Sequence, residues 1–174
     1  GDQLNTMTPA FWNELPVLIR ELDVSGAARV VVLASTGRHF SAGMDLAVFG
    51  GGAGRGSDGA EVGRLRANLR SNVLHLQDTF TAIERARMPV LAAIQGGCIG
   101  GAVDMVTACD IRYASEEAFF CIQEINIGMT ADVGTLQRLP KLIPEGVCRE
   151  LAYTGRRMPA SEAKAVGLVN EVFP

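Results

Sequence analysis

The stretch PVLAAIQGGCIGGAVDMVTACDIRYAS, residues 89–115, contains the pattern that decides the fold. PVLAAIQG (89–96) is a short apolar run that predicts a buried strand, and the glycine-rich segment after it predicts a tight turn that enters a helix. DIRYAS (110–115) predicts the next strand. Because strand–helix–strand connections are right-handed crossovers between parallel strands, the stretch predicts an α/β fold with a mostly parallel sheet.

The rest of the chain repeats this alternation. Thr8 and Pro9 are typical of a helix start, and the apolar spacing after them predicts a helix that Pro16 kinks or divides. RVVVLAS (29–35) predicts a buried strand, and apolar residues three and four apart over 61–87 predict a long amphipathic helix. We also expect a strand at 118–123, helices at 133–142 and 145–153, a helix capped by Ser161, and a strand at 168–173.

Length and composition favour one domain over residues 1–174, since 48% of the residues are apolar and supply a substantial core. A net charge of -3 disfavours a broad contact with nucleic acid. The apolar runs are shorter than the roughly 20 residues of a membrane span, so no membrane partner is expected. The four cysteines form no C-x-x-C pair and favour a reducing, intracellular compartment. Residues 50–60 contain six glycines and predict a mobile surface loop.

Two glycine turns, SAGMD (41–45) and GGCIGGAVD (96–104), share a layout in which a buried strand ends and small residues follow. Each turn frees backbone N–H groups that can face an anion, and two converging turns can stabilise a thioester enolate. The alternative is that the glycines only permit tight turns and close packing. GCIGGA lacks the G-K-[ST] of a phosphate loop and is a poor dinucleotide fingerprint.

Taken in order, these segments resemble the crotonase superfamily, also called the enoyl-CoA hydratase/isomerase family. The resemblance runs through LNTMTPAFWNEL (4–15), HFSAGMDL (39–46), the stretch at 88–115 and SEAKAVGLVNEVF (161–173), which covers nearly the whole chain. It implies the crotonase (ClpP/crotonase-like) fold, with repeated ββα units and a mostly parallel sheet. Family members begin with further strands and continue with helices that cover the active site, so the resemblance implies a partial core.

Within that superfamily, residues 108–141 look most like the Δ3,Δ5-Δ2,Δ4-dienoyl-CoA isomerases, whose three acids fall on Asp104, Glu124 and Asp132. Hydratases of the family have glutamates at the first two positions and lack the third acid. The resemblance implies isomerisation of 3,5-dienoyl-CoA to 2,4-dienoyl-CoA in fatty acid β-oxidation. We expect Glu124 near C2, Asp132 near C6 and Asp104 near both, although the assignment of C2 and C6 and the acyl length stay open.

The resemblance also implies an oxyanion hole made by the backbone N–H groups of Met44 and Gly101. Substrate and CoA contacts are expected from Gly101 and from Ser41, Ala42, Gly43, Met44 and Asp45. It implies no metal and no cofactor, since coenzyme A is part of the acyl-CoA substrate. Family members form homotrimers or dimers of trimers, in the cytoplasm of bacteria or in mitochondria or peroxisomes of eukaryotes.

Each of the three acids also has a simpler interpretation. Asp132 is a good N-cap for a helix beginning at Val133, Glu124 can be a solvated strand end, and Asp104 can pair with Arg112. Arg138, on the helix after Asp132, is expected on a solvated or intersubunit face. Alternative functions are an enoyl-CoA hydratase, a Δ3,Δ2-enoyl-CoA isomerase or a non-catalytic acyl-CoA-binding protein of the crotonase type.

Overall fold

The computed structural model describes residues 4–45 and 61–174, and the loop predicted at 50–60 lies outside these ranges. In chain order the elements are α1 (Pro9–Ser25), β1 (Val31–Leu33), α3 (Val62–Glu84), β2 (Val90–Ile94), β3 (Gly97–Ile99), α4 (Gly101–Thr107), β4 (Ile111–Ser115), β5 (Phe119–Cys121), the 3₁₀ helix η1 (Glu124–Ile127), α5 (Thr135–Arg138), the 3₁₀ helix η2 (Leu139–Lys141), α6 (Glu145–Thr154), β6 (Met158–Pro159), α7 (Ala160–Ala165) and β7 (Glu171–Phe173).

The strands form two sheets. The four-stranded sheet has the order β1-β2-β4-β7 and is parallel throughout. The three-stranded sheet has the order β3-β5-β6, in which β3 and β5 are parallel and β6 is antiparallel to β5. β2 with β3, and β4 with β5, each send two consecutive strands into the two sheets before a helical segment follows. The expected α/β fold with a mostly parallel arrangement is confirmed.

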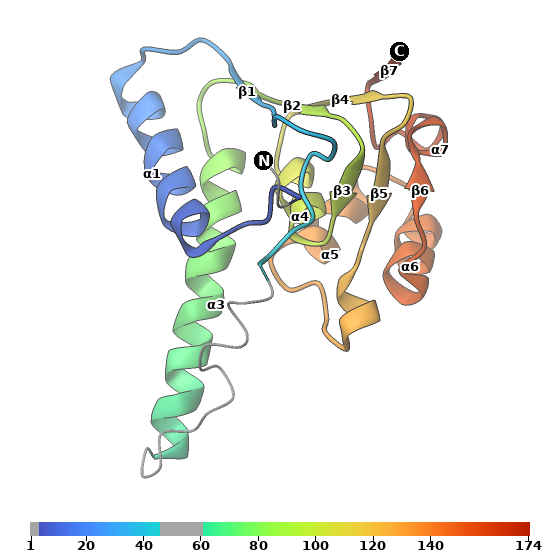
Figure 1. The fold of residues 1–174 in the computed structure, drawn as a ribbon. Coiled ribbons are helices and arrows are strands. Elements are labelled where there is room, and N and C mark those ends of the chain that lie inside the picture. Colours follow the sequence, from blue (N-terminus) through green and yellow to red (C-terminus); the bar gives the residue numbers. More distant parts are fainter. Residues whose placement is uncertain (1–3, 46–60) are drawn as a thin grey trace.

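Helices α1 and α3 lie side by side along one flank of the sheets, and one end of α3 projects beyond the other described elements (Figure 1). Trp12 of α1 packs on Phe80 of α3, with ring centroids 5.2 Å apart. In contrast, α4 lies near the centre of the molecule, and every one of its residues is buried. A polar side chain on α4 is therefore removed from water, which matters for Asp104 below.

The first helix begins as predicted but is not divided by Pro16. The hydroxyl of Thr8 accepts the N–H of Phe11 at 3.4 Å, and the helix continues from Pro9 to Ser25. Proline lacks an N–H, so the carbonyl of Trp12, four residues before Pro16, loses its intrahelical donor. The Thr79 hydroxyl on α3 donates to that carbonyl at 3.2 Å. Of the two predicted effects of Pro16, a kink or a division, the division was wrong, because Thr79 of a neighbouring helix satisfies the exposed acceptor.

Other elements also differ from the predicted ones. The second glycine turn contains β3, since its backbone pairs with β5. The helix expected at 133–142 begins only at Thr135, because Gly134 has a φ of 135° that is not helical. It gives way at Leu139 to η2, which contains Pro140. α7 begins at Ala160 with Pro159 at its N-cap position, so the predicted Ser161 cap was wrong. β1 covers only Val31–Leu33 of the expected 29–35.

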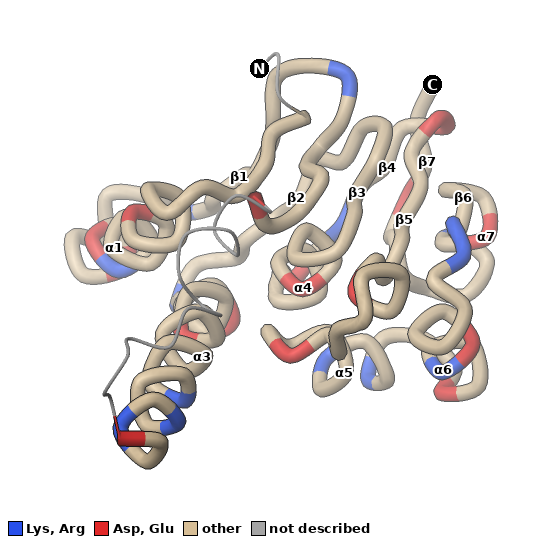
Figure 2. Tube along the Cα trace, turned by 60° about the horizontal axis from the view of Figure 1, so that its bottom comes forward, with Lys and Arg blue, Asp and Glu red and all other residues tan. Residues whose placement is uncertain are grey.

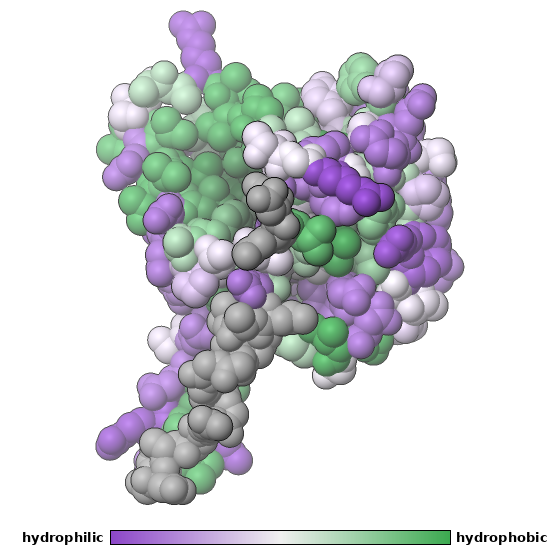
Figure 3. Space-filling view, in the orientation of Figure 1, coloured by the Kyte–Doolittle hydropathy of each residue, from purple (hydrophilic) through white to green (hydrophobic). Residues whose placement is uncertain are grey.

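Two features of the surface follow from this architecture. Figure 3 shows an apolar area over α1 and the neighbouring edge of the sheet, where β1 is an edge strand and Val32 is 56% exposed. Acidic and basic residues are mixed along the outer helices (Figure 2). Within residues 4–45 and 61–174, no helix combines the length and apolar character needed to cross a membrane.

Candidate active site

A pocket of about 140 Å³ lies where the two glycine turns meet η1 and the segment before α5. Five of the predicted site residues line it, namely Ala42, Met44, Gly101, Glu124 and Asp132. The remaining lining residues are Trp12, Gly100, Gln123, Ile127, Met129 and Val133. The wall is mainly apolar with two carboxylates, an arrangement suited to proton transfer away from bulk water.

The two glycine turns converge through backbone pairing. Ser41 forms a parallel bridge with Cys98, in which the N–H of Ser41 donates to Gly97 and the N–H of Ile99 donates to Ser41. Gly43 permits a closer approach, since its φ is 81° and a Cβ there would lie 2.6 Å from the Ile99 carbonyl oxygen and 3.0 Å from the Gly101 nitrogen. Glycine is common where two backbones approach this closely, because it has no Cβ.

The backbone N–H groups of Met44 and Gly101 are near each other and face away from the pairing that holds the turns. Met7 donates to the carbonyl of Gly43 and accepts from the N–H of Asp45, so the intervening Met44 N–H points to the opposite side. Gly101 is the first residue of α4, where an N–H has no intrahelical acceptor. A Cβ at Gly101 would lie 3.8 Å from the Met44 nitrogen. The two donors can therefore reach one oxygen atom.

Asp104 lies behind the pocket on α4 and has no exposed surface. Its Oδ1 accepts the backbone N–H of Thr135 at 2.5 Å, and its Oδ2 is buried without a hydrogen-bond partner in the described part of the chain. Burial raises the pKa of Asp104 to about 6, with the Thr135 bond opposing the shift. The negative charge of Asp132 contributes to this rise, and the positive charge of Arg138 opposes it.

The alternative pairing of Asp104 with Arg112 is wrong. The Arg112 guanidinium is buried and donates to three backbone carbonyls, those of Leu168 at 2.6 Å, Cys109 at 2.5 Å and Val106 at 3.2 Å. These bonds satisfy the carbonyls where α4 ends and join them to the segment before β7. Arg112 is therefore a structural residue.

Glu124 is the first residue of η1 and points into the pocket wall beside the second glycine turn. Its Oε2 is buried and has no hydrogen-bond partner within residues 4–45 and 61–174, and a Cβ at Gly100 would lie 3.3 Å from its Oε1. The pKa of Glu124 is raised to about 7, mainly by burial, and the negative charges of Asp104 and Asp132 contribute to the rise. The solvated interpretation of Glu124 was wrong, because its Oε2 is removed from water. A carboxyl group with a pKa raised in this way can exchange protons near neutral pH.

Asp132 lines the same pocket but is an exposed residue. The interpretation of Asp132 as a helix cap is wrong, since α5 begins at Thr135 with Gly134 at the N-cap position, and the Thr135 N–H is bound by Asp104. The backbone carbonyl of Asp132 accepts the side-chain amide of Gln77 at 2.7 Å. Its carboxylate thus remains available to the pocket.

The remaining residues of the first glycine turn have mainly structural contacts. The Ser41 hydroxyl donates to the Asn5 carbonyl at 2.7 Å and accepts the Gly43 N–H at 3.1 Å. The backbone N–H of Asp45 donates to Met7. Ser41, Gly43 and Asp45 do not line the pocket around Glu124, whereas Ala42 and Met44 do.

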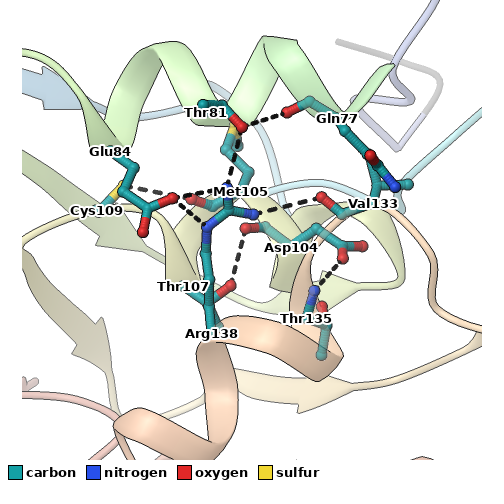
Figure 4. Close-up of polar contacts among 10 residues, drawn as sticks. All are labelled: Gln77, Thr81, Glu84, Asp104, Met105, Thr107, Cys109, Val133, Thr135 and Arg138. Atoms are coloured by element: carbon teal, nitrogen blue, oxygen red, sulfur yellow. Dashed lines mark hydrogen bonds and ion pairs between the residues drawn. The ribbon is translucent and has the colours of Figure 1, made fainter. Parts of the chain in front are cut away.

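Arg138 was expected on a solvated or intersubunit face, and the solvated interpretation was wrong, since the residue is only 9% exposed. Its guanidinium forms an ion pair with Glu84 at 2.9 Å and donates to the Val133 carbonyl at 3.4 Å, as Figure 4 shows. The sequence pattern gave no indication of this ion pair, because Glu84 and Arg138 are brought together only by the packing of α3 on α5. Within the described ranges, no cluster of three or more His, Cys, Asp or Glu could hold a metal ion.

Comparisons with known proteins agree with the architecture. The chain is 45% identical over 170 residues to the peroxisomal Delta(3,5)-Delta(2,4)-dienoyl-CoA isomerase of Arabidopsis thaliana, covering 98% of this chain and 61% of that protein. It is also 45% identical over 176 residues to the mitochondrial protein of the same name from Homo sapiens, covering 98% of this chain and 52% of that protein. The chain thus spans between half and two thirds of the length of these relatives.

A solved structure shows the same fold. A protein from Thermobifida fusca, in complex with acetoacetyl-CoA, superposes with a TM-score of 0.80 and 32% identity, covering 93% of this chain and 62% of that one. Residues 2–174 match the family description "Enoyl-CoA hydratase/isomerase". The expected crotonase fold is confirmed, and the chain belongs to the enoyl-CoA hydratase/isomerase family.

Proposed function

We propose that the protein isomerises 3,5-dienoyl-CoA to 2,4-dienoyl-CoA, and that this chain carries the reacting residues. The observation that carries the proposal is the placement of Glu124 and Asp132 on one mainly apolar pocket with Asp104 buried behind it. The names of the relatives support the same reaction. An acyl-CoA ligand is further supported by the acetoacetyl-CoA complex of the Thermobifida fusca protein.

In the proposed reaction, the thioester oxygen accepts the N–H groups of Met44 and Gly101. Glu124 takes the proton from C2, and the electron pair of that C–H bond forms the C2–C3 double bond. The C3–C4 double bond then moves to C4–C5, and the electrons of the C5–C6 double bond take a proton from Asp132 at C6. Two double bonds move by one position each, so proton transfer alone balances the reaction. The oxyanion donors stabilise the negative charge of the intermediate dienolate.

Asp104 is proposed to act through its charge rather than by contact with substrate. It is buried behind the pocket, and its charge raises the pKa of Glu124. A base with a pKa near the working pH combines a useful ionised fraction with sufficient basicity. Asp104 therefore helps to set the proton affinity of Glu124.

The full-length protein should convert a 3,5-dienoyl-CoA to the conjugated 2,4-product, which is followed by its ultraviolet absorbance. Asp132→Asn should lower this rate by about 10² to 10⁴ fold, because it removes the proton donor for C6. Asp78→Asn on α3 is the control, since Asp78 is an exposed carboxylate paired with Arg20. A wild-type protein that hydrates a 2-enoyl-CoA but leaves the diene unchanged would contradict the proposal.

Assembly and location stay predictions. We expect homotrimers or dimers of trimers for the full-length protein, which a mass measurement during size-exclusion chromatography would test. The two isomerase relatives are named as peroxisomal and mitochondrial proteins. We expect one of these organelles for a eukaryotic source and the cytoplasm for a bacterial one.

A further inference from the structure

The turn that carries Asp132 is held through its backbone. Gln77 on α3 donates its side-chain amide to the Asp132 carbonyl at 2.7 Å, and Arg138 donates to the next carbonyl, that of Val133, at 3.4 Å. The N–H of Thr135 is bound by Asp104 at 2.5 Å. In contrast, no hydrogen bond or ion pair reaches the Asp132 carboxylate from the described residues. The place of this carboxylate in the pocket therefore depends on the position of its backbone.

One face of α3 supplies the Gln77 contact and the side chains that bind Arg138. Gln77, Thr81 and Glu84 are spaced by four and three residues, which places them along a single side of the helix. Figure 4 shows this side turned toward Val133 and Arg138. Glu84 binds the Arg138 guanidinium through Nε at 3.0 Å and Nη2 at 2.9 Å, and the Thr81 hydroxyl accepts from Nη2 at 3.4 Å.

Arg138 joins this face of α3 to the Asp132 turn. A buried guanidinium needs a charged partner and hydrogen-bond acceptors, and Glu84 and the Val133 carbonyl supply both. Gly134 allows the turn to lie directly on the guanidinium, because a Cβ there would be 1.8 Å from Nη1. The turn, the guanidinium and α3 therefore form one packed unit with little freedom to move separately.

We propose that Gln77 is a positioning residue for Asp132, and that Gln77 and the Glu84–Arg138 pair together set the place of the Asp132 carboxylate relative to C6 of the substrate. This inference rests on the proposed dienoyl-CoA isomerisation. Gln77 does not line the pocket, so it acts through the Asp132 backbone rather than by touching substrate. None of these bonds reaches η1, which carries Glu124. Loss of the Gln77 bond should therefore impair proton return at C6 more than proton removal at C2.

The test separates these two proton transfers in the full-length protein. Gln77→Met keeps the length of the side chain and removes the donor. With a 3,5-dienoyl-CoA in D₂O, isomerisation is followed by ultraviolet absorbance and exchange at C2 by mass spectrometry of the remaining substrate. We expect kcat for isomerisation to fall about tenfold to a hundredfold, with KM and the C2 exchange rate within about twofold of wild type.

Two further variants sharpen the result. Glu84→Gln keeps the shape of the side chain but removes the charge that anchors Arg138, so it too should lower kcat for isomerisation more than the C2 exchange rate. Asn72→Met is the control, since Asn72 is an exposed residue of the same helix. It should leave both rates at the wild-type level.

Two outcomes would overturn the inference while leaving the proposed function intact. One is wild-type isomerisation by both Gln77→Met and Glu84→Gln, and the other is an equal loss of isomerisation and C2 exchange, which would mean a general loss of the site. A wild-type protein that performs neither isomerisation nor C2 exchange would overturn the proposed function itself, and the inference with it. The wild-type measurement thus distinguishes the two failures.

Discussion

The carboxylate of Asp104 accepts the backbone N–H of Thr135 at 2.5 Å, and this bond joins the buried helix α4 to the segment that carries Asp132. The bond uses Oδ1 and leaves the buried Oδ2 without a partner in the described part of the chain. A buried polar atom without a partner is costly to stability. Asp104 thus connects two parts of the candidate site at some cost in folding free energy.

The cost of Asp104 should appear in the pH dependence of stability. Its pKa is about 6 in the folded protein against an ordinary value of 3.8. Between about pH 4 and pH 6 the folded state therefore binds more protons than the unfolded state, and the free energy of unfolding falls as pH rises. The difference in pKa corresponds to about 3 kcal/mol.

Asp104→Asn should reduce the fall in the free energy of unfolding with rising pH, because the amide keeps an acceptor for the Thr135 N–H and carries no charge. Urea denaturation of both proteins from acid to neutral pH measures the effect. Part of the loss should persist in the variant up to about pH 7, since the pKa of Glu124 is also raised, to about 7. If the free energy of unfolding fell equally steeply with pH in both proteins, Asp104 would not be the source of the pH dependence.

The same pair of acids predicts the pH dependence of catalysis. If ionised Glu124 removes the C2 proton, kcat/KM should fall about tenfold per pH unit below its pKa of about 7. Burial is the largest cause of this raised pKa, and the negative charges of Asp104 and Asp132 follow. Asp104→Asn removes one of these charges, so the midpoint should move to lower pH. Steady-state rates across the pH range measure the midpoint, and a shift to higher pH would contradict this role.

Gly43 should be needed for the oxyanion donors. Gly43→Ala places a Cβ 2.6 Å from the Ile99 carbonyl oxygen and 3.0 Å from the Gly101 nitrogen, which forces the two glycine turns apart. We expect kcat/KM for the dienoyl-CoA to fall by about a hundredfold, as for loss of one oxyanion donor.

Gly26→Ala is the matched control for that change. Gly26 also has a positive φ, of 64°, but nothing lies within 4 Å of the added Cβ. Both variants carry a similar backbone strain of about 1 kcal/mol, which thermal unfolding measures. Equal activity of the two variants would mean that the spacing of the turns does not matter for the reaction.

The tolerance of α1 for Pro16 should depend on Thr79. Thr79→Val removes the hydroxyl that donates to the Trp12 carbonyl and should cost about 1–3 kcal/mol of unfolding free energy. Pro16→Ala restores an N–H at the position that normally binds this carbonyl. In the presence of Pro16→Ala, the cost of Thr79→Val should therefore be smaller. A double-mutant cycle measured by urea denaturation tests this, and additive costs would refute the explanation.

The local sequence determined the helices and strands that depend on local residue patterns. Apolar spacing at 61–87 predicted a helix that the structure places at Val62–Glu84, and Thr8 with Pro9 predicted the start of α1. Strand and helix alternation predicted the parallel arrangement. The resemblance of ordered motifs indicated which acids to consider, and the structure places Glu124 and Asp132 on one pocket with Asp104 behind it.

Only the tertiary structure decided the partners of these residues. Asp132 looked like a cap, but the helix N–H nearest to it binds Asp104, 31 residues earlier in the chain. Arg138 looked solvated, but α3 covers it and supplies Glu84. Gln77 and Asp132 are 55 residues apart and meet through a bond that no periodicity encodes. Residue patterns report which side of a helix or strand is buried, whereas the partner of a polar group depends on which distant element packs against it.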